Sequence, residues 1–140
     1  MNLSELGWDP NWDQSWAELA ADGCQPGRVV AVHRDRFILW TATGELEATA
    51  CGRLRRGDID PAEHPLVGDW VVCGSGAVVL GALPRRSCVV RRQPGPGTPR
   101  PQPIVANVDT LLLVVGLDGN YRPSRVERYL TIAQIGRAHV

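Results

Sequence analysis

The sequence predicts a mainly β fold, in which a small five-stranded barrel follows an N-terminal helix and precedes the start of an α/β domain. Three observations predict this fold. Five short β-rich runs lie between residues 27 and 83, with a long irregular segment after the third. A tryptophan-rich helical stripe comes before them, and a proline-rich segment and a continuous apolar run come after them. Five strands with a long excursion after the third are typical of an OB-fold; another small barrel or a β-sandwich is the alternative.

A helix is expected to begin at residue 10. Asp9 is a favoured N-cap residue, and Pro10 fits the first helical position. The apolar residues that then share one helical face are Trp12, Trp16, Leu19 and Ala20. The helix is expected to end near Asp22-Gly23. Its tryptophan face is expected to pack on the barrel or on the following domain rather than to bind a ligand.

The barrel strands are predicted from composition and from alternation. They are Gly27–His33, Arg36–Ala42, Glu45–Ala50, Asp69–Cys73 and Ala77–Leu83. In the third run, Leu46, Ala48 and Ala50 alternate with polar residues, which indicates one buried face and one solvated face. The pairs Arg34-Asp35 and Thr43-Gly44 are short enough to form the first two hairpin turns, and glycine supplies the positive φ that such turns need.

A cluster of arginines follows the third strand. Arg53, Arg55 and Arg56 lie within four residues of one another. Guanidinium groups match phosphate oxygens in a bidentate way, so this cluster is a candidate nucleic-acid contact. The alternative for this segment is a solvated loop with a buried Leu54.

A second group of arginines follows the last barrel strand and is expected near one rim of the barrel. Its members are Arg85, Arg86, Arg91 and Arg92. OB-folds bind nucleic acids through a strand face and adjacent loops. Phe37 and Trp40 have opposite parity on their strand, so they cannot form one stacking surface. This favours recognition of the backbone and shape of structured RNA over stacking on single strands.

The net charge is zero, but the charge is unevenly distributed along the chain. Residues 1–26 carry five acids and no base, whereas residues 85–103 carry five arginines and no acid. Such a chain can bind a polyanion with one part and repel it with another. All fifteen basic residues are arginine, which excludes a Walker A loop and any other lysine-dependent phosphate site from this sequence.

The second half of the chain is predicted to begin with a linker. Residues 93–103 contain five prolines and two glycines, which is typical of an extended, semi-rigid segment. Leu111–Val115 is continuously apolar, as in a strand buried on both faces of a parallel sheet. A helical stripe follows it. One strand and one helix cannot cover both faces of such a strand, so residues 104–134 are expected to be the start of a truncated domain.

The cysteines and the hydropathy pattern indicate a cytoplasmic protein. The cysteines Cys24, Cys51, Cys73 and Cys88 form no C-x-x-C pair, so free thiols are expected, with a zinc site or a disulfide framework as the alternative. No run approaches about 18 apolar residues, and the acidic N-terminus lacks an apolar signal region. Neither a membrane span nor secretion is therefore expected.

Seven short segments occur in an order and spacing shared with a known family: GRVV, GEL, GRLR, VGDW, LPRRS, VANVDTLLLVVGLDG and RVERYLT. This order resembles the N-terminal part of the ribosome small-subunit-dependent GTPase A family over residues 6–134. The resemblance implies an N-terminal helical arm (1–26), an OB-fold RNA-binding domain (27–92), a linker (93–103) and the start of a circularly permuted P-loop GTPase domain (104–134).

The resemblance also implies an activity and partners. Members hydrolyse GTP and assist late maturation of the small ribosomal subunit, with GTP, Mg and a structural Zn bound to the full-length protein. The N-K-x-D and P-loop motifs are absent from these residues, so no catalytic, nucleotide-binding or metal-binding residue is predicted and the fragment is expected to be inactive. The predicted rRNA phosphate contacts are Arg53, Arg55, Arg56, Arg85 and Arg86. We expect a monomer that binds the small subunit but neither DNA nor membrane.

Two alternative functions are open at this point. One is a stand-alone OB-fold module without enzymatic activity, which should not leave Leu111–Val115 exposed. The other is a protein-interaction barrel whose acidic helix docks a partner. Residues 135–140 fall outside the resemblance. They can be encoded by ATC-GGA-AGA-GCA-CAC-GTC, a common sequencing-adapter string, and the hypothesis is that this tail derives from an adapter; a real, short C-terminus is the alternative.

Overall fold

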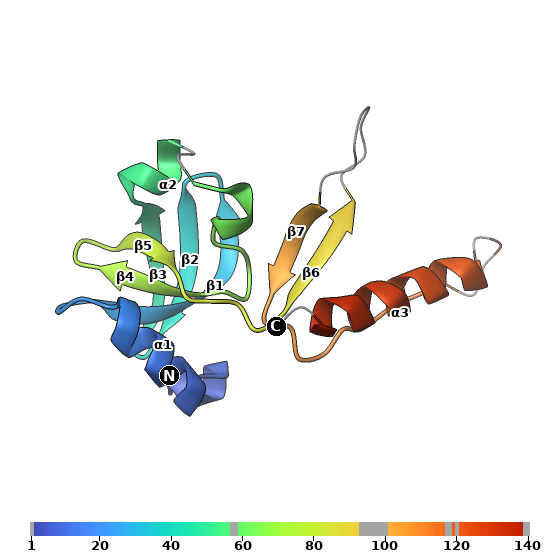
Figure 1. Ribbon diagram of the computed structural model, residues 1–140, viewed down its shortest axis with the longest axis horizontal. Helices are drawn as coiled ribbons and strands as arrows, with labels where there is room; N and C mark the ends of the chain where they lie inside the picture. The colour runs from blue at the N-terminus through green and yellow to red at the C-terminus, as the bar shows by residue number, and fades with distance from the viewer. Residues whose placement is uncertain (1, 57–58, 93–100, 117–118, 120, 139–140) are drawn as a thin grey trace. The chain divides into compact units, whose positions relative to one another are not determined.

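The computed structural model describes residues 2–56, 59–92, 101–116, 119 and 121–138 (Figure 1). The chain divides into two compact units, Met1–Pro84 and Arg85–Val140. The first unit contains a closed barrel and an N-terminal helix, and the second contains a β-hairpin and a long helix. The sequence prediction placed the end of the barrel domain at residue 92, eight residues later.

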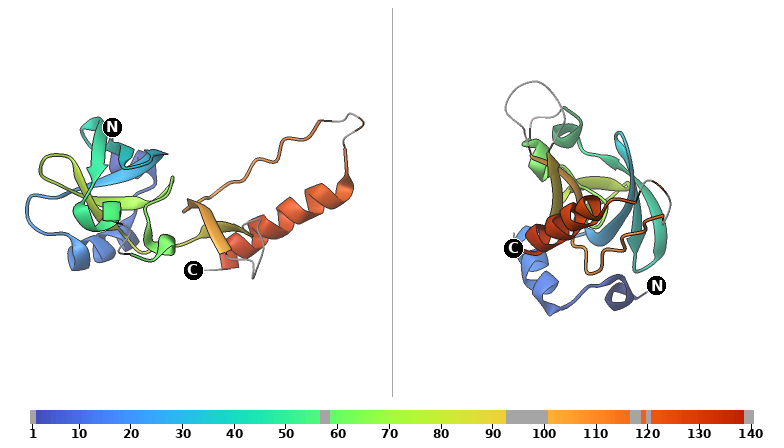
Figure 2. Two further views of the ribbon diagram at one scale, coloured as in Figure 1. Left: turned by 90° about the horizontal axis from the view of Figure 1, so that it is seen from above. Right: turned by 90° about the vertical axis from the view of Figure 1, so that its right-hand side faces the viewer.

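The barrel consists of five strands in the closed order β1-β2-β3-β5-β4 (Figures 1 and 2). They are β1 (Gln25–His33), β2 (Arg36–Thr41), β3 (Gly44–Ala50), β4 (Trp70–Gly74) and β5 (Val78–Ala82). β3 and β5 pair in parallel, whereas the other neighbours, including β1 and β4, pair antiparallel. The predicted five-stranded OB-fold barrel is thus confirmed, with each strand within two residues of its predicted bounds.

The interior of the barrel follows from strand alternation. In β3 the buried residues Ala48 and Ala50 alternate with exposed polar ones, as predicted. Val29, Phe37 and Leu39 point into the same core and are at most 1% exposed. The core is tight at Gly27, where an added Cβ would lie 3.0 Å from Leu39 Cδ1. A larger residue at this position would displace the leucine.

Strand β4 is buried on both of its faces. Val71 and Cys73 belong to the barrel core, whereas Trp70 and Val72 belong to a second apolar cluster outside the barrel. The N-terminal arm, residues 2–24, supplies the other side of that cluster, with Trp12 only 3% exposed. The predicted tryptophan face of the helix therefore packs on the barrel.

The arm contains two helical segments, η1 (Leu3–Leu6) and α1 (Pro10–Leu19). The Asp9 side chain caps α1 by accepting from the Asn11 amide at 2.8 Å, with Pro10 at the first helical position, as predicted. The helix ends at Leu19, a few residues earlier than expected, and this leucine is 53% exposed. The apolar stripe is thus shorter than the sequence indicated.

Short helices lie between β3 and β4, where the sequence indicated an irregular segment. They are α2 (Gly52–Arg56) and η2 (Pro61–Glu63). Leu54 of α2 is 2% exposed and belongs to the barrel core. At the entry to β4, the buried Asp69 carboxylate accepts from the Leu66 amide at 2.8 Å. This bond holds the turn that leads into the strand.

The second unit contains a hairpin whose second strand overlaps the end of the predicted linker. β6 (Cys88–Arg92) pairs antiparallel with β7 (Pro101–Ala106), and α3 (Pro123–Ala138) completes the unit. The linker prediction is wrong for residues 101–103, and residues 93–100 lie outside the described part. Prolines are tolerated in β7 because a two-stranded hairpin consists of edge strands.

The prediction that Leu111–Val115 forms a strand buried on both faces is wrong for this chain. The segment forms no strand, Leu112 is 85% exposed and Val114 is 92% exposed. A buried strand needs hydrogen-bonded neighbours and two covering layers. The described residues of this unit offer one hairpin and one helix, which are too few elements to provide them.

The four cysteines are free thiols, as predicted. Among the described residues, no group of three His, Cys, Asp or Glu side chains could hold a metal ion. No helix in the described part of the chain has both the length and the apolar character required to cross a membrane.

Candidate nucleic-acid interface

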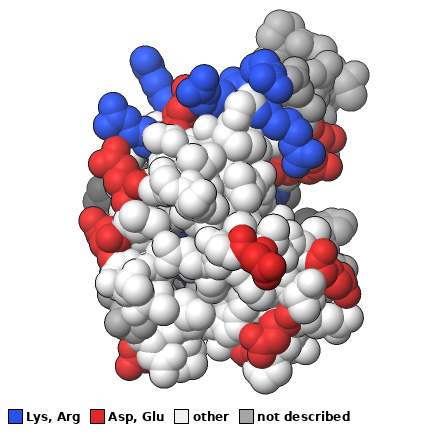
Figure 3. Space-filling view, turned by 90° about the vertical axis from the view of Figure 1, so that its left-hand side faces the viewer, with Lys and Arg blue, Asp and Glu red and all other residues white. Residues whose placement is uncertain are grey.

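Helix α2 presents the first predicted arginine cluster at one end of the barrel. Leu54 anchors the helix in the core, while Arg53, Arg55 and Arg56 are exposed. Figure 3 shows arginine side chains gathered at this end of the first unit. The two features that the sequence offered as alternatives, exposed arginines and a buried leucine, therefore occur together. The buried leucine orients the arginines toward solvent.

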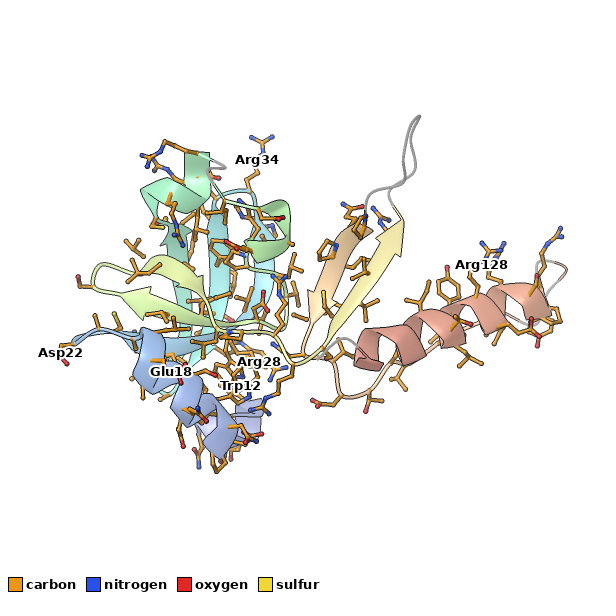
Figure 4. All side chains as sticks on the ribbon, viewed as in Figure 1. Trp12, Glu18, Asp22, Arg28, Arg34 and Arg128 are labelled. Carbon is orange, nitrogen blue, oxygen red and sulfur yellow. The ribbon has the colours of Figure 1, made fainter. Side chains whose placement is uncertain are left out.

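The turn between β1 and β2 lies beside α2. Its Asp35 carbonyl accepts a hydrogen bond of 2.9 Å from the amide of Ala50, the last residue of β3 before the helix. Arg34 in this turn has a φ of 52° and points away from the barrel at the same end (Figure 4). From the sequence, this residue was predicted only to form part of a turn. Its proximity to α2 depends on strand register, which the local sequence does not reveal.

Arg36 extends the basic end but has an acidic neighbour. Its Nη1 donates to Glu47 Oε1 at 3.0 Å, and the two side chains are 68% and 56% exposed. An exposed pair of this kind contributes about 0–1 kcal/mol and can rearrange. Arg36 is therefore a weaker candidate for phosphate contact than the arginines of α2.

Arg85 and Arg86 belong to the second unit and not to the barrel unit. Both side chains are half-buried, and the Arg86 amide donates to Asn107 Oδ1 at 2.9 Å. This bond ties the start of the unit to the end of β7. The assignment of these two arginines to rRNA phosphates stays a prediction, and so does the placement of Arg91 and Arg92 at the barrel rim.

The opposite end of the barrel is acidic and aromatic. The acids of the arm are Glu5, Asp9, Asp13, Glu18 and Asp22. Glu18 and Asp22 lie on the arm, away from Arg34 (Figure 4). Trp8 Nε1 donates to Asp13 Oδ1 at 2.7 Å, and the Trp8 ring meets Trp70 edge-on at 4.8 Å. The hydrogen bond fixes the Trp8 ring within the arm, and the ring contact with Trp70 holds the arm against the barrel.

Phe37 and Trp40 do not form a joint stacking surface, as predicted from strand parity. Phe37 is 1% exposed in the core, whereas Trp40 is 40% exposed on the outer side of the same strand. The feature of this barrel that suits a nucleic acid is thus the end that carries exposed arginine side chains. Such an end suits phosphates better than bases.

Comparison with known proteins places the chain in a family. A small ribosomal subunit biogenesis GTPase RsgA from Opitutus terrae is 36% identical over 151 residues, covering 99% of this chain and 41% of the relative. The protein of the same name from Syntrophotalea carbinolica is 35% identical, covering 94% of this chain and 39% of the relative. The chain belongs to the RsgA family. No protein-family model matches it.

The similarity extends to other RsgA proteins. The relative from Leptospira interrogans is 34% identical, covering 99% of this chain and 38% of its own length. The chain thus spans about two fifths of the length of the RsgA relatives that it matches. The match includes the residues of both units described above.

Proposed function

We propose that these residues form the RNA-contacting part of a GTPase that assists maturation of the small ribosomal subunit. Family membership supports the biological setting, because the RsgA relatives are named for biogenesis of that subunit. The observation that supports the RNA contact is the arginine end of the barrel. Three exposed arginines on α2 share an end with Arg34. We place this function in the cytoplasm.

The arginine end suits an RNA backbone for a physical reason. Guanidinium groups donate several hydrogen bonds in a fixed fork and match phosphate oxygens better than ammonium groups do. Anchoring α2 through Leu54 reduces the entropy lost when its side chains bind. Structured RNA exposes its backbone while its bases are paired. This suits a barrel on which Phe37 and Trp40 do not together form a surface for stacking bases.

GTP hydrolysis is proposed for the longer protein and not for these residues. The sequence contains no lysine, so it contains neither an N-K-x-D nor a G-K-[ST] motif. GTP, Mg and a structural Zn are accordingly proposed to bind segments of the longer protein other than these 140 residues. We expect this chain alone neither to bind nor to hydrolyse GTP.

A stand-alone binding module is the second candidate. It was expected to keep Leu111–Val115 covered, because exposed apolar segments promote association. Leu112 and Val114 are instead among the most exposed apolar residues described. This exposure supports the proposal that the second unit packs against further parts of the longer protein.

The arginine end is tested by removing Arg55 and Arg56 together, as R55A/R56A. Binding of the chain to purified small ribosomal subunits is measured at several salt concentrations. Each lost phosphate contact reduces counterion release, so the salt slope of log K is expected to decrease by about one unit per contact. The affinity at low salt is expected to fall with it.

The matched control is R125A/R128A, which removes two exposed arginines from α3. We expect this control to leave the salt slope close to that of the unchanged chain. If R55A/R56A binds with an unchanged slope, these side chains face solvent in the complex and the assignment is wrong. Equal effects of both variants would indicate attraction by net charge alone.

A further inference from the structure

Four side chains form a row across the outer face of the barrel. Glu45 on β3 is the register partner of Trp40 on β2, and Trp40 is the partner of Arg28 on β1. Arg28 is in turn the partner of Trp70 on β4. Directly opposed residues of antiparallel strands share one face of the sheet. The row thus places a carboxylate, an indole, a guanidinium and a second indole side by side.

The two indoles of this row differ in what covers them. Trp70 is fully buried under the N-terminal arm, with the Trp8 ring edge-on at 4.8 Å and the Arg28 guanidinium 5.5 Å from its centroid. Trp40 is 40% exposed, and its Nε1 donates to Glu45 Oε2 at 3.4 Å. A large exposed indole, held by a neighbouring carboxylate, is a common anchor in binding surfaces.

Trp40 forms a wall of a groove of about 330 Å³ between the arm and the barrel. The residues that line it are Glu5, Leu6, Arg28, Val29, Val30, Trp40, Val67 and Gly68. Its surface is mostly apolar, and Val67 on its border is 37% exposed. The groove is therefore large enough for one or two apolar side chains.

Acidic side chains outnumber basic ones around the groove. Glu5 lines it, and Glu45 lies beside Trp40. The one cation in the lining, Arg28, donates to the Leu6 carbonyl at 2.9 Å and lies over Trp70, so it is already engaged with the arm and β4. The acids of the arm add negative charge at this end. A polyanion would be repelled here, whereas a cationic side chain would be attracted.

We propose that this groove docks a basic peptide segment of a protein partner. One apolar side chain of the segment enters the groove beside Val67. A flanking arginine or lysine lies over the exposed Trp40 ring, with the Glu45 and Glu5 carboxylates as its counter-charges. Cation–π contact with an indole and two nearby carboxylates favour a guanidinium or ammonium group over any neutral one. This site is separate from the arginine end and does not depend on RNA binding there.

The test uses nuclear magnetic resonance of the whole chain, in which the five indole Nε1–H signals are assigned with single tryptophan variants. The probe is the blocked peptide Arg-Arg-Leu-Arg-Arg. It is expected to shift the signals of Trp40 Nε1 and of the Val67 amide and to leave that of the buried Trp70 in place. The peptides Glu-Glu-Leu-Glu-Glu and Arg-Arg-Gly-Arg-Arg test the required charge and the required apolar side chain, and both are expected to bind more weakly.

Three variants locate the binding. E45Q and E5Q are each expected to weaken peptide binding about two- to fivefold, as for exposed ion pairs. W40L is expected to weaken peptide binding about three- to tenfold. Because this variant has no Trp40 signal, its binding is measured from the shift of the Val67 amide signal. The matched control is E18Q, which removes one acid from α1 outside the groove and is expected to leave binding unchanged.

Several outcomes would overturn the proposal. One is an equal shift of Trp40 with the acidic peptide, and another is an equal loss of binding in E18Q and E45Q, which would indicate attraction by net charge alone. A stronger shift with a uridine hexanucleotide would make the groove a base-stacking site instead. If W40L does not fold, the surface variants E45Q and E5Q still decide the question.

Discussion

The two ends of the barrel unit are built in opposite ways. At the acidic end, the arm covers Trp70 and Val72 with several aromatic rings, and little of that interface is open to solvent. At the arginine end, a five-residue helix depends on one buried side chain, Leu54, and its charged residues are exposed. One end is thus stabilised by apolar packing, whereas the other keeps its charged side chains exposed to solvent.

Trp70→Ala should have the largest effect on stability. Trp70 is fully buried between the barrel and the arm, so its removal leaves a large cavity and detaches Trp8 from β4. We expect a loss of about 3–5 kcal/mol in the free energy of unfolding, measured by urea denaturation. Trp40→Leu, in the same row but exposed, should cost under about 1 kcal/mol. Similar losses in both variants would mean that the arm contributes little.

Leu54→Ala should loosen the arginine end. Leu54 is 2% exposed and links α2 to the barrel core. The expected loss in unfolding free energy is about 2–5 kcal/mol, because a buried leucine leaves a cavity. Binding to small ribosomal subunits should weaken in parallel, since the three arginines lose their fixed placement. Arg53→Ala on the same helix is the control and should change stability by no more than about 0.5 kcal/mol. Unchanged stability in Leu54→Ala would contradict the anchoring role.

Arg28→Gln should release the arm in part. The guanidinium donates to the Leu6 carbonyl at 2.9 Å and lies over the Trp70 ring, and glutamine keeps neither contact fully. We expect about 1–2 kcal/mol of lost stability and faster proteolytic cleavage within the arm.

Gly7→Ala tests the same contact from the other side. Gly7 has a φ of +89°, and an added Cβ would lie 2.8 Å from Arg28 Nη1, so alanine is expected to be strained there. We expect the arm to become accessible to protease in both variants. A resistant arm in both would show that the aromatic contacts alone retain it.

The smallest expected effect is a loss of stability at high pH that depends on Cys73. Burial, reinforced by the neighbouring Cys24, raises the pKa of the Cys73 thiol above its ordinary value. Because the unfolded chain loses this proton at lower pH, the stabilisation is complete below the ordinary thiol pKa of about 8.5 and decreases as the pH rises through it. Urea denaturation between about pH 7 and pH 10 should show this decrease, and Cys73→Ala should reduce it. Faster alkylation at Cys73 than at Cys51 would contradict the raised pKa.

Much of the first unit could be predicted from local patterns. Asp9 and Pro10 identified the start of α1, and the alternation in β3 identified its buried face. The arginines of α2 were found because they are adjacent in sequence. Arg34 and the row from Glu45 to Trp70 could not be found in this way, because they depend on which strands are neighbours and in which register. A hairpin turn fixes the Trp40–Glu45 pair, but the register shift in β1 and the pairing of β1 with the distant β4 do not follow from short motifs.

Two apolar runs share one sequence pattern but differ in burial. Trp70–Cys73 and Leu111–Val115 are both continuously apolar, and that pattern alone indicates burial on two faces. In β4 the burial is real, since the barrel core covers one face and the arm covers the other. Leu111–Val115 is instead largely exposed, since the described residues around it form no such layers. Composition shows which segments need to be covered, because hydrophobicity is a property of each side chain. Which of them is covered depends on the fold, because a covering layer comes from residues distant in the chain.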